Sequence, residues 1–327
     1  MTIKVADLAL DPPVFLAPMA GITDLPFRNL VQKFGAGLVV SEMVASQEMV
    51  QARPGTCERS ELGLNAENTA VQIAGRDSHW MAEAARMLED RGVRLIDINM
   101  GCPARKVTGG NSGAALMRDL PLAMQLIDAV VEAVDTPVSL KMRLGWDDES
   151  LNSPALARAA QNAGVQMITV HGRTRCQFYK GRADWQAISP VKRAVDVPVI
   201  ANGDITDAGA AKNALDKSGA DGVMVGRGVQ GQPWLLAQIA AELFGRAAPI
   251  IPSGAALVDL VSEHYLASLA FYGSELGNRV MRKHLGWYMD CAGTPAELRA
   301  PLLRESENKR VIAMLSQVLG TPWADAA

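Results

Sequence analysis

The sequence lacks the features that mark disulfide-rich and membrane proteins. It has only four cysteines in 327 residues (Cys57, Cys102, Cys176 and Cys291), and no two of them form a Cys-x-x-Cys pair. We therefore expect reduced thiols, three of them without a further role, as in cytoplasmic proteins. No apolar run approaches membrane-spanning length, and the first residues contain no apolar signal segment. The sequence predicts a cytoplasmic protein with no membrane contact and no metal site.

An excess of basic residues is also missing. The chain has 32 basic and 35 acidic residues, a formal net charge of −3, and as a sum this argues against a nucleic-acid partner. The distribution differs from the sum, because residues 171–183 contain four cations and no acid: Arg173, Arg175, Lys180 and Arg182. Since local charge and not the sum decides phosphate binding, this segment removes the argument against a nucleic-acid partner.

What the sequence does contain is a large apolar fraction, 49%, arranged with a regular alternation. Helix-periodic stretches separate short β-rich apolar runs. Eight strands alternating with helices fit either a closed (β/α)₈ barrel (a TIM barrel) or an open doubly wound sheet. Most of the runs end in glycine or polar residues, and only in a barrel do all carboxyl ends meet at one mouth, so we expect the barrel. The predicted strands are residues 14–17, 38–41, 70–74, 95–100, 138–142, 167–171, 198–201 and 222–225.

Beyond Phe244 the strand pattern stops. A Pro- and Gly-containing linker follows at residues 249–254, and the remaining chain is helix-periodic, at 255–271, 276–291, 295–303 and 306–319. We therefore predict two domains, a catalytic barrel over residues 1–245 and an all-helical domain resembling a four-helix bundle over 246–327.

Two loops near the end of the predicted barrel indicate a phosphate site. The glycines of residues 226–231 fit Gly-x-Gly-x-x-Gly, but a dinucleotide fingerprint needs a further strand about 20 residues on, and here the chain turns helical. Loops after strands seven and eight form the usual phosphate site of such barrels. The residues concerned are Asn202, Gly203 and Asp204 in the first loop, and Gly226 and Arg227 in the second.

Cationic and amide side chains cluster on the central strands. Alternation places Lys141 and Arg143 on one face of strand five, where two cations need an anion or an electron-rich ring. His171 ends strand six close to Arg173, and Gln72 and Asn99 add amides suited to an oxo-nitrogen ring. Together with the phosphate loops, these groups describe a flavin mononucleotide (FMN) pocket, with the lysine near the part of the ring that gains negative charge on reduction.

Cys102 directly follows strand four and precedes a proline. A cysteine in such a place can be a small buried hydrophobe, a nucleophile or a general acid. No histidine follows nearby to activate a thiolate, so a neutral thiol that donates a proton beside a hydride-donating flavin fits better.

Seven of these segments, in order, resemble the tRNA-dihydrouridine synthases, and the Asn-Met-Gly-Cys-Pro form together with the helical tail resembles the bacterial B subgroup most. The segments are Leu-Ala-Pro-Met-Ala-Gly-Ile-Thr-Asp (16–24), Val-Gln-Ile-Ala-Gly (71–75), Asp-Ile-Asn-Met-Gly-Cys-Pro (97–103), Leu-Lys-Met-Arg (140–143), Val-His-Gly-Arg-Thr (170–174), Ala-Asn-Gly-Asp (201–204) and Met-Val-Gly-Arg (224–227).

The resemblance implies FMN-dependent reduction of the uracil C5–C6 bond in the D-loop of tRNA, at position 17 for the B subgroup, with NADPH (or NADH) as reductant. It implies hydride transfer from flavin N5 to C6 and protonation of C5 by Cys102. Asn99, Arg143 and Arg173 would touch the flavin or the substrate uracil. The residues that would hold FMN are Pro18, Met19, Ala20, Gln72, Lys141, His171, Asn202, Gly203, Asp204, Gly226 and Arg227.

A uridine inside folded tRNA must be extruded to reach a flavin, and we expect the helical domain to grip the tRNA. Its basic run at residues 279–284 predicts either a cationic patch or a solvated helix face. The alternatives are a flavin reductase of a free pyrimidine, which has no need for a helical tail, and an RNA-binding protein with a vestigial barrel. We expect no obligate protein partner.

Overall fold

A closed ring of eight parallel strands forms the centre of the computed structural model, which describes residues 2–53, 59–64 and 66–320. Neighbouring strands pair in sequence order, and the β11–β3 and β4–β6 pairings complete the ring. All eight predicted strands and the (β/α)₈ barrel are confirmed. The strands are β3 (Val14–Leu16), β4 (Leu38–Val40), β6 (Thr69–Ala74), β7 (Ile96–Met100), β8 (Val138–Arg143), β9 (Met167–His171), β10 (Val199–Asn202) and β11 (Gly222–Val225).

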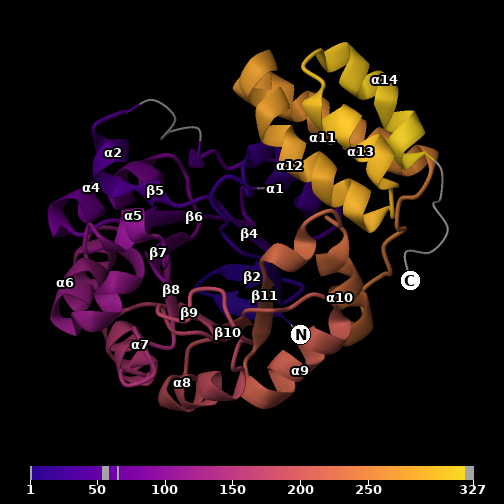
Figure 1. The fold of residues 1–327 in the computed structure, drawn as a ribbon. Helices are drawn as coiled ribbons and strands as arrows, with labels where there is room; N and C mark the ends of the chain where they lie inside the picture. The colour runs from indigo at the N-terminus through magenta and orange to yellow at the C-terminus, as the bar shows by residue number, and fades with distance from the viewer. Residues whose placement is uncertain (1, 54–58, 65, 321–327) are drawn as a thin grey trace.

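Helices surround this ring (Figure 1). Every residue of β6, β7, β10 and β11 is buried, which is why these strands are mainly apolar. Their buried polar residues include Gln72, Asp97 and Asn202. A two-residue strand, β5 (Val44–Ala45), pairs beside β6. The helical elements are α1 (Leu25–Lys33), α2 (Ser46–Val50), α4 (Ser78–Asp90), α5 (Arg105–Thr108), η1 (Gly113–Arg118), α6 (Leu120–Val131), α7 (Ser153–Ala163), η2 (Gln186–Ile188), α8 (Ser189–Ala194), α9 (Ala208–Ser218), η3 (Arg227–Val229) and α10 (Leu235–Phe244).

Local sequence signals fix the ends of the main barrel helices. Aspartate side chains cap α1, α4, α6 and α9 by accepting a backbone N–H of the first turn; they are Asp24, Asp77, Asp119 and Asp207. At the other end, Gly164 and Gly219 follow α7 and α9 with φ of 110° and 68°. Such left-handed residues stop a helix and turn the chain toward the next strand.

A hairpin that the sequence did not suggest closes the amino end of the barrel. Strands β1 (Ile3–Val5) and β2 (Leu8–Leu10) pair antiparallel. Their buried side chains form one apolar cluster with side chains inside the amino end of the barrel, including Phe15 and Leu38. This plug leaves the carboxyl end as the place where the interior opens to ligands.

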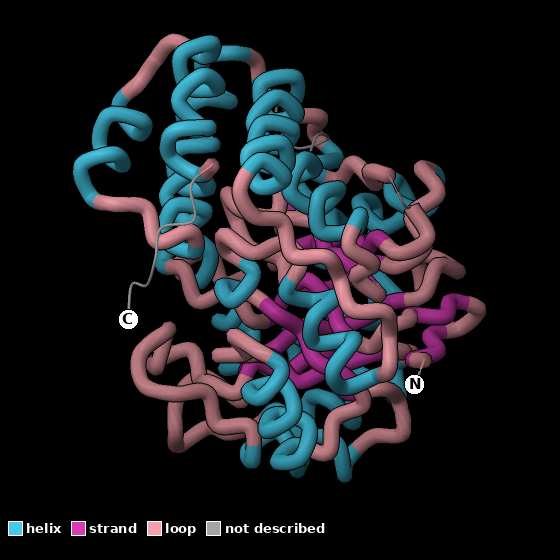
Figure 2. Tube along the Cα trace, turned by 90° about the vertical axis from the view of Figure 1, so that its right-hand side faces the viewer, coloured by secondary structure: helices cyan, strands magenta, loops and turns pink. Residues whose placement is uncertain are grey.

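Four further helices form a separate body beside α1, as Figures 1 and 2 show. They are α11 (Ala255–Tyr272), α12 (Ser274–Cys291), α13 (Ala296–Arg304) and α14 (Asn308–Leu319). They confirm the predicted helical region and share a core of their own, centred on residues such as Tyr265, Leu285 and Leu315. Phe27 of α1 packs against His264 and His284, with ring centroids 5.6 and 5.2 Å apart. The division at residues 245 and 246 into two domains stays a prediction.

The basic run at residues 279–284 is only partly exposed, and its role as a cationic patch stays a prediction. His284 is 1% exposed, and Lys283 donates a hydrogen bond to the barrel loop at Gly21. A helix turns by 100° per residue, so Arg279, Arg282 and Lys283 share one side of α12, whereas His284 faces the core of the helical region. Arg279 is exposed to solvent.

Three further observations concern the cysteines, membrane-spanning helices and metal-binding groups. Cys57 lies outside the described residues, whereas Cys176 and Cys291 are exposed, unpaired thiols. Over the described ranges, no helix is long and apolar enough to cross a membrane. Over the same ranges, no group of three or more His, Cys, Asp or Glu side chains is arranged to hold a metal ion.

Candidate active site

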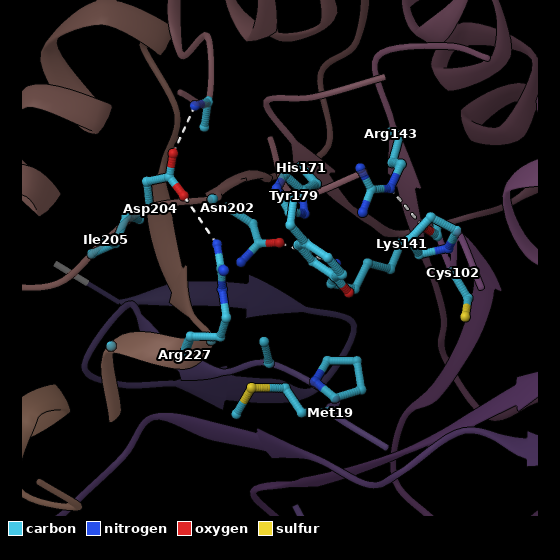
Figure 3. A pocket seen from close by; sticks show the side chains of 18 of the residues that line it. Met19, Cys102, Lys141, Arg143, His171, Tyr179, Asn202, Asp204, Ile205 and Arg227 are labelled. Carbon is cyan, nitrogen blue, oxygen red and sulfur yellow. Dashed lines mark hydrogen bonds and ion pairs between the residues drawn. The ribbon is translucent and has the colours of Figure 1, made fainter. Parts of the chain in front are cut away.

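A cavity of about 1370 Å³ occupies the carboxyl end of the barrel. Figure 3 shows Cys102 at one end and the Asp204–Arg227 pair at the other, with Lys141 and Tyr179 between them. Of the predicted site residues, Arg173 does not line this cavity. Those that do are Pro18, Met19, Ala20, Gln72, Asn99, Cys102, Lys141, Arg143, His171, Asn202, Gly203, Asp204, Gly226 and Arg227.

Lys141 of β8 points into the middle of the cavity, while its strand neighbours Leu140 and Met142 pack into the outer core. Its Nζ donates to Asn202 Oδ1 at 3.1 Å. Burial, and next the charge of Arg143, lower the pKa of Lys141 to about 8. A buried amine with this single hydrogen bond in the described chain retains donors for an electron-rich ligand.

Arg143 lies on the same face of β8, and its guanidinium holds two loops together. Nε donates to the carbonyl of Gly101 at 2.8 Å, and Nη1 donates to the carbonyls of Thr174 and Phe178, both at 2.9 Å. Arg143 therefore joins the loop that carries Cys102 to the loop after β9. Its side chain also borders the cavity, so the predicted contact with substrate stays a prediction.

A buried hydrogen-bond network places the backbone of Cys102. Asp97, 3% exposed, accepts from Ser139 at 2.7 Å and from Gln72 Nε2 at 2.6 Å. Gln72 Oε1 in turn accepts from Asn99 Nδ2 at 2.6 Å, and Asn99 Oδ1 accepts the N–H of Cys102 at 3.0 Å. Each amide has one orientation that satisfies this chain, so Asp97 fixes Asn99 through Gln72. The sequence analysis did not single out Asp97.

The far end of the cavity contains a carboxylate that is paired with a buried arginine, and an exposed cation beside it. Asp204 accepts from both terminal nitrogens of Arg173, at 2.8 and 2.5 Å, and from the N–H of Ala183 at 2.7 Å. Burial alone would raise the pKa of Asp204, but the hydrogen bonds from Arg173 and Ala183 and the nearby positive charges lower it. Arg227, its side chain 55% exposed, lies 3.4 Å from Asp204 and keeps donors for an anion.

Arg173 is 1% exposed and contacts residues that line the cavity without lining it itself. Besides Asp204, it donates to the carbonyls of Lys180 and Gly181 and lies 3.3 Å from His171 Nε2. Burial, followed by the surrounding cations, holds the pKa of His171 well below its usual value. The imidazole is therefore neutral at pH 7, and Arg173 orients it.

Tyr179 is a cavity residue that the sequence analysis did not select. Its ring lies 5.5 Å from the Arg143 guanidinium and 5.0 Å from that of Arg227, both within the range of cation–π contacts. It is 44% exposed, and in Figure 3 it lies across the cavity. The only sequence signal was its place inside the cationic segment 171–183.

The helical region is tied directly to the loop that lines the cavity. Gly21, with φ of 72°, follows the lining residue Ala20, and its carbonyl accepts a hydrogen bond from Lys283 of α12. Tyr272 of α11 donates to Asp24 at 3.0 Å in the same loop. Burial raises the pKa of Asp24 to about 6.

Replacing Lys283 with methionine is expected to lower the free energy of unfolding by about 0.5–1.5 kcal/mol, because the exposed Gly21 carbonyl exchanges a charged donor for water. Denaturant unfolding measures the change. Lys309→Met, at an exposed position of α14, is the control, and equal stability of the two variants would contradict the proposed strength of this link.

A (β/α)₈ barrel with cationic and amide side chains gathered at its carboxyl end defines an enzyme whose active site lies at the barrel mouth. Residues 15–319 match the family model of dihydrouridine synthase, and the chain therefore belongs to the dihydrouridine synthase family. The resemblance noted from the seven segments is confirmed.

Two relatives show how far this similarity extends. A "Probable tRNA-dihydrouridine synthase" of Rhodobacter capsulatus is 61% identical over 316 residues, which are 96% of this chain and 97% of the relative. A "tRNA-dihydrouridine synthase B" of Xanthomonas campestris is 44% identical over 311 residues, 95% of this chain and 94% of the relative.

A solved structure, histamine dehydrogenase from Rhizobium sp. 4-9, aligns with a TM-score of 0.56 at 12% identity. The alignment covers 81% of this chain but only 50% of the other, so this chain spans half the length of that protein. At this identity the similarity supports the fold alone.

Proposed function

We propose that this chain is an FMN- and NADPH-dependent tRNA-dihydrouridine synthase that reduces the C5–C6 bond of a D-loop uridine. Family membership supports the reaction class. The observation that carries the assignment is that one cavity contains Cys102, with its backbone fixed by Asn99, together with the buried amine of Lys141.

The residues present fit FMN on two counts. Lys141 and the amides of Gln72 and Asn99 offer donors and acceptors to a flavin ring, and Arg227 offers a cation to its phosphate. At Gly226 an added Cβ would meet only Met19 Sδ at 3.7 Å and Ala17 Cβ at 3.8 Å, so the protein leaves space there. We propose that the predicted cofactor residues, from Pro18 to Arg227, hold FMN, with Arg173 positioning His171 and Asp204.

Bound FMN would supply the hydride that reaches uracil C6 and would be reduced again by NADPH. Cys102 would donate its thiol proton to C5, which completes the addition of two hydrogens across the double bond. Lys141 and Arg143 line the same cavity as Cys102, so their positive charges would offset the negative charge left when the thiol gives up its proton.

Several finer expectations are part of the same proposal. They are position 17 as the target, NADPH rather than NADH, tRNA binding by the helical region, a cytoplasmic location and the absence of an obligate protein partner. The link between Lys283 and Gly21 supports a helical region that acts together with the cavity.

Purified protein with FMN and NADPH is expected to form dihydrouridine in tRNA from a synthase-deficient strain, and mapping the product identifies the position. Free uracil and orotate, which both have an unsaturated C5–C6 bond, are the comparison substrates. Turnover of either at the rate of tRNA would favour the free-pyrimidine reductase. A protein that does not bind FMN but does bind tRNA would contradict the enzyme assignment.

A further inference from the structure

A second cavity, of about 1230 Å³, lies against the first one. Ala20 and Met43 line both cavities. Barrel loops form one side of the second cavity, and the helical region forms the other through residues that include Phe271 of α11 and Val280 of α12. The chemistry assigned to the first cavity leaves the second one without a role.

The segment that carries Cys102 borders both cavities. Cys102 and Ala104 line the first cavity, whereas Lys106 and Val107 line the second. A ligand that fills both cavities therefore passes Ala20 and Met43, which line both, and runs beside the segment that carries Cys102. A free pyrimidine is too small to do so, but consecutive nucleotides of one RNA strand can.

The second cavity has the side chains that recognise a nucleotide. Trp80 at the start of α4 and Phe271 are half-buried rings on which a base can stack. Arg76 and Lys106 are exposed cations at the edge, suited to phosphate.

Glu42, the chain neighbour of Met43, adds a buried acceptor to the second cavity. It is 8% exposed, and its Oε1 accepts the N–H of Gly21 at 2.5 Å. Its Oε2 has no hydrogen-bond partner in the described part of the chain. A carboxylate oxygen only accepts hydrogen bonds, so it favours a base that presents an amino group.

We propose that the second cavity binds the nucleotide next to the target uridine, with its base stacked on Trp80 and an exocyclic amino group donating to Glu42. Adenine, cytosine or guanine is then favoured over uracil, which has no amino group. This inference rests on the proposed function, because a neighbouring nucleotide exists only in a polynucleotide substrate.

The test uses FMN-loaded enzyme and tRNA transcripts in which each neighbour of the target uridine is replaced in turn by an abasic nucleotide. For one neighbour, kcat/KM of the unaltered enzyme is expected to fall about tenfold, the usual effect of losing one stacked base. The Trp80→Ala variant is expected to have a kcat/KM about tenfold lower than the unaltered enzyme on the intact transcript. On the transcript with the abasic neighbour, the two enzymes are expected to have the same kcat/KM.

Glu42→Gln sharpens the test without removing the side chain. Its amide oxygen can still accept the Gly21 N–H, while its NH₂ group would face the cavity, so the preference is expected to shift from amino-bearing bases toward uracil. Glu83→Gln, on an exposed part of α4, is the matched control. The FMN content and the rate of flavin reduction by NADPH should stay unchanged in all three variants.

The inference would be overturned if neither abasic neighbour of the target changed kcat/KM by more than about twofold. It would also be overturned if Trp80→Ala lowered kcat/KM on the abasic transcript as much as on the intact one. If the unaltered enzyme forms no dihydrouridine even in the intact transcript, the proposed function itself fails and this inference fails with it.

Discussion

Replacing Cys102 with alanine is expected to lower the rate of tRNA reduction by about 10²–10⁴-fold, the usual contribution of a positioned general acid. Alanine removes the proton donor but leaves the backbone N–H that Asn99 holds. Flavin binding depends on other residues of the cavity, so FMN content should not change. The measurement is anaerobic single turnover, in which reduced enzyme is mixed with tRNA and flavin reoxidation is followed.

Two comparisons make this result specific. Cys176→Ala removes an exposed thiol from the loop after β9 and should leave the rate unchanged. Reduction of the bound flavin by NADPH should proceed at the same rate in both variants, because it requires no proton at C5. An unaltered single-turnover rate in Cys102→Ala would mean that another group, such as Lys141, or water supplies the proton.

The barrel was predictable because its determinants are local. Parallel strands covered on both sides are mainly apolar, so β6 and β10 are evident as short apolar-rich runs between helical stretches. The alternation of side chains along β8 correctly predicted that Lys141 and Arg143 both face the cavity. The hairpin of β1 and β2 was not predicted, because two three-residue strands give too short a pattern.

The partners of the buried charges were not predictable, because they come from distant parts of the chain. From the sequence, Arg143 and Arg173 are expected as cations at the barrel mouth. In the structure each is buried and donates hydrogen bonds to loop carbonyls. The cationic segment 171–183 therefore contributes less free charge to a phosphate-binding surface than its composition indicates. Arg182 is exposed and lines the cavity.

The same limit applies to the contact between the helical region and the barrel. The lysine at position 283 is one of three consecutive basic residues in the sequence, yet it donates to Gly21, 262 residues away. Periodicity predicts which residues form a helix but not which loop lies opposite one of its faces. Asp97 shows this also, since its effect on Cys102 passes through Gln72 and Asn99.

Lys141 is expected to make FMN binding depend on pH above neutrality. Burial and the charge of Arg143 lower its pKa to about 8 in the free protein, so the amine is mostly charged at pH 7 and mostly neutral at pH 9. A ligand that interacts with the charged amine must then take up a proton on binding. The affinity should be constant near pH 7 and fall by up to about tenfold per pH unit above pH 8.

Lys141→Gln is expected to weaken FMN binding by about 10–100-fold at pH 7, the loss of a hydrogen bond to a charged group, and to abolish the decrease above pH 8. Titration of apoprotein with FMN, followed by fluorescence quenching between pH 7 and 9.5, measures both effects, and Lys212→Gln on the exposed face of α9 is the control. His171 stays neutral over this range because its pKa is far lower. A decrease of the same size in Lys141→Gln would assign the titration to another group and remove Lys141 from the flavin site.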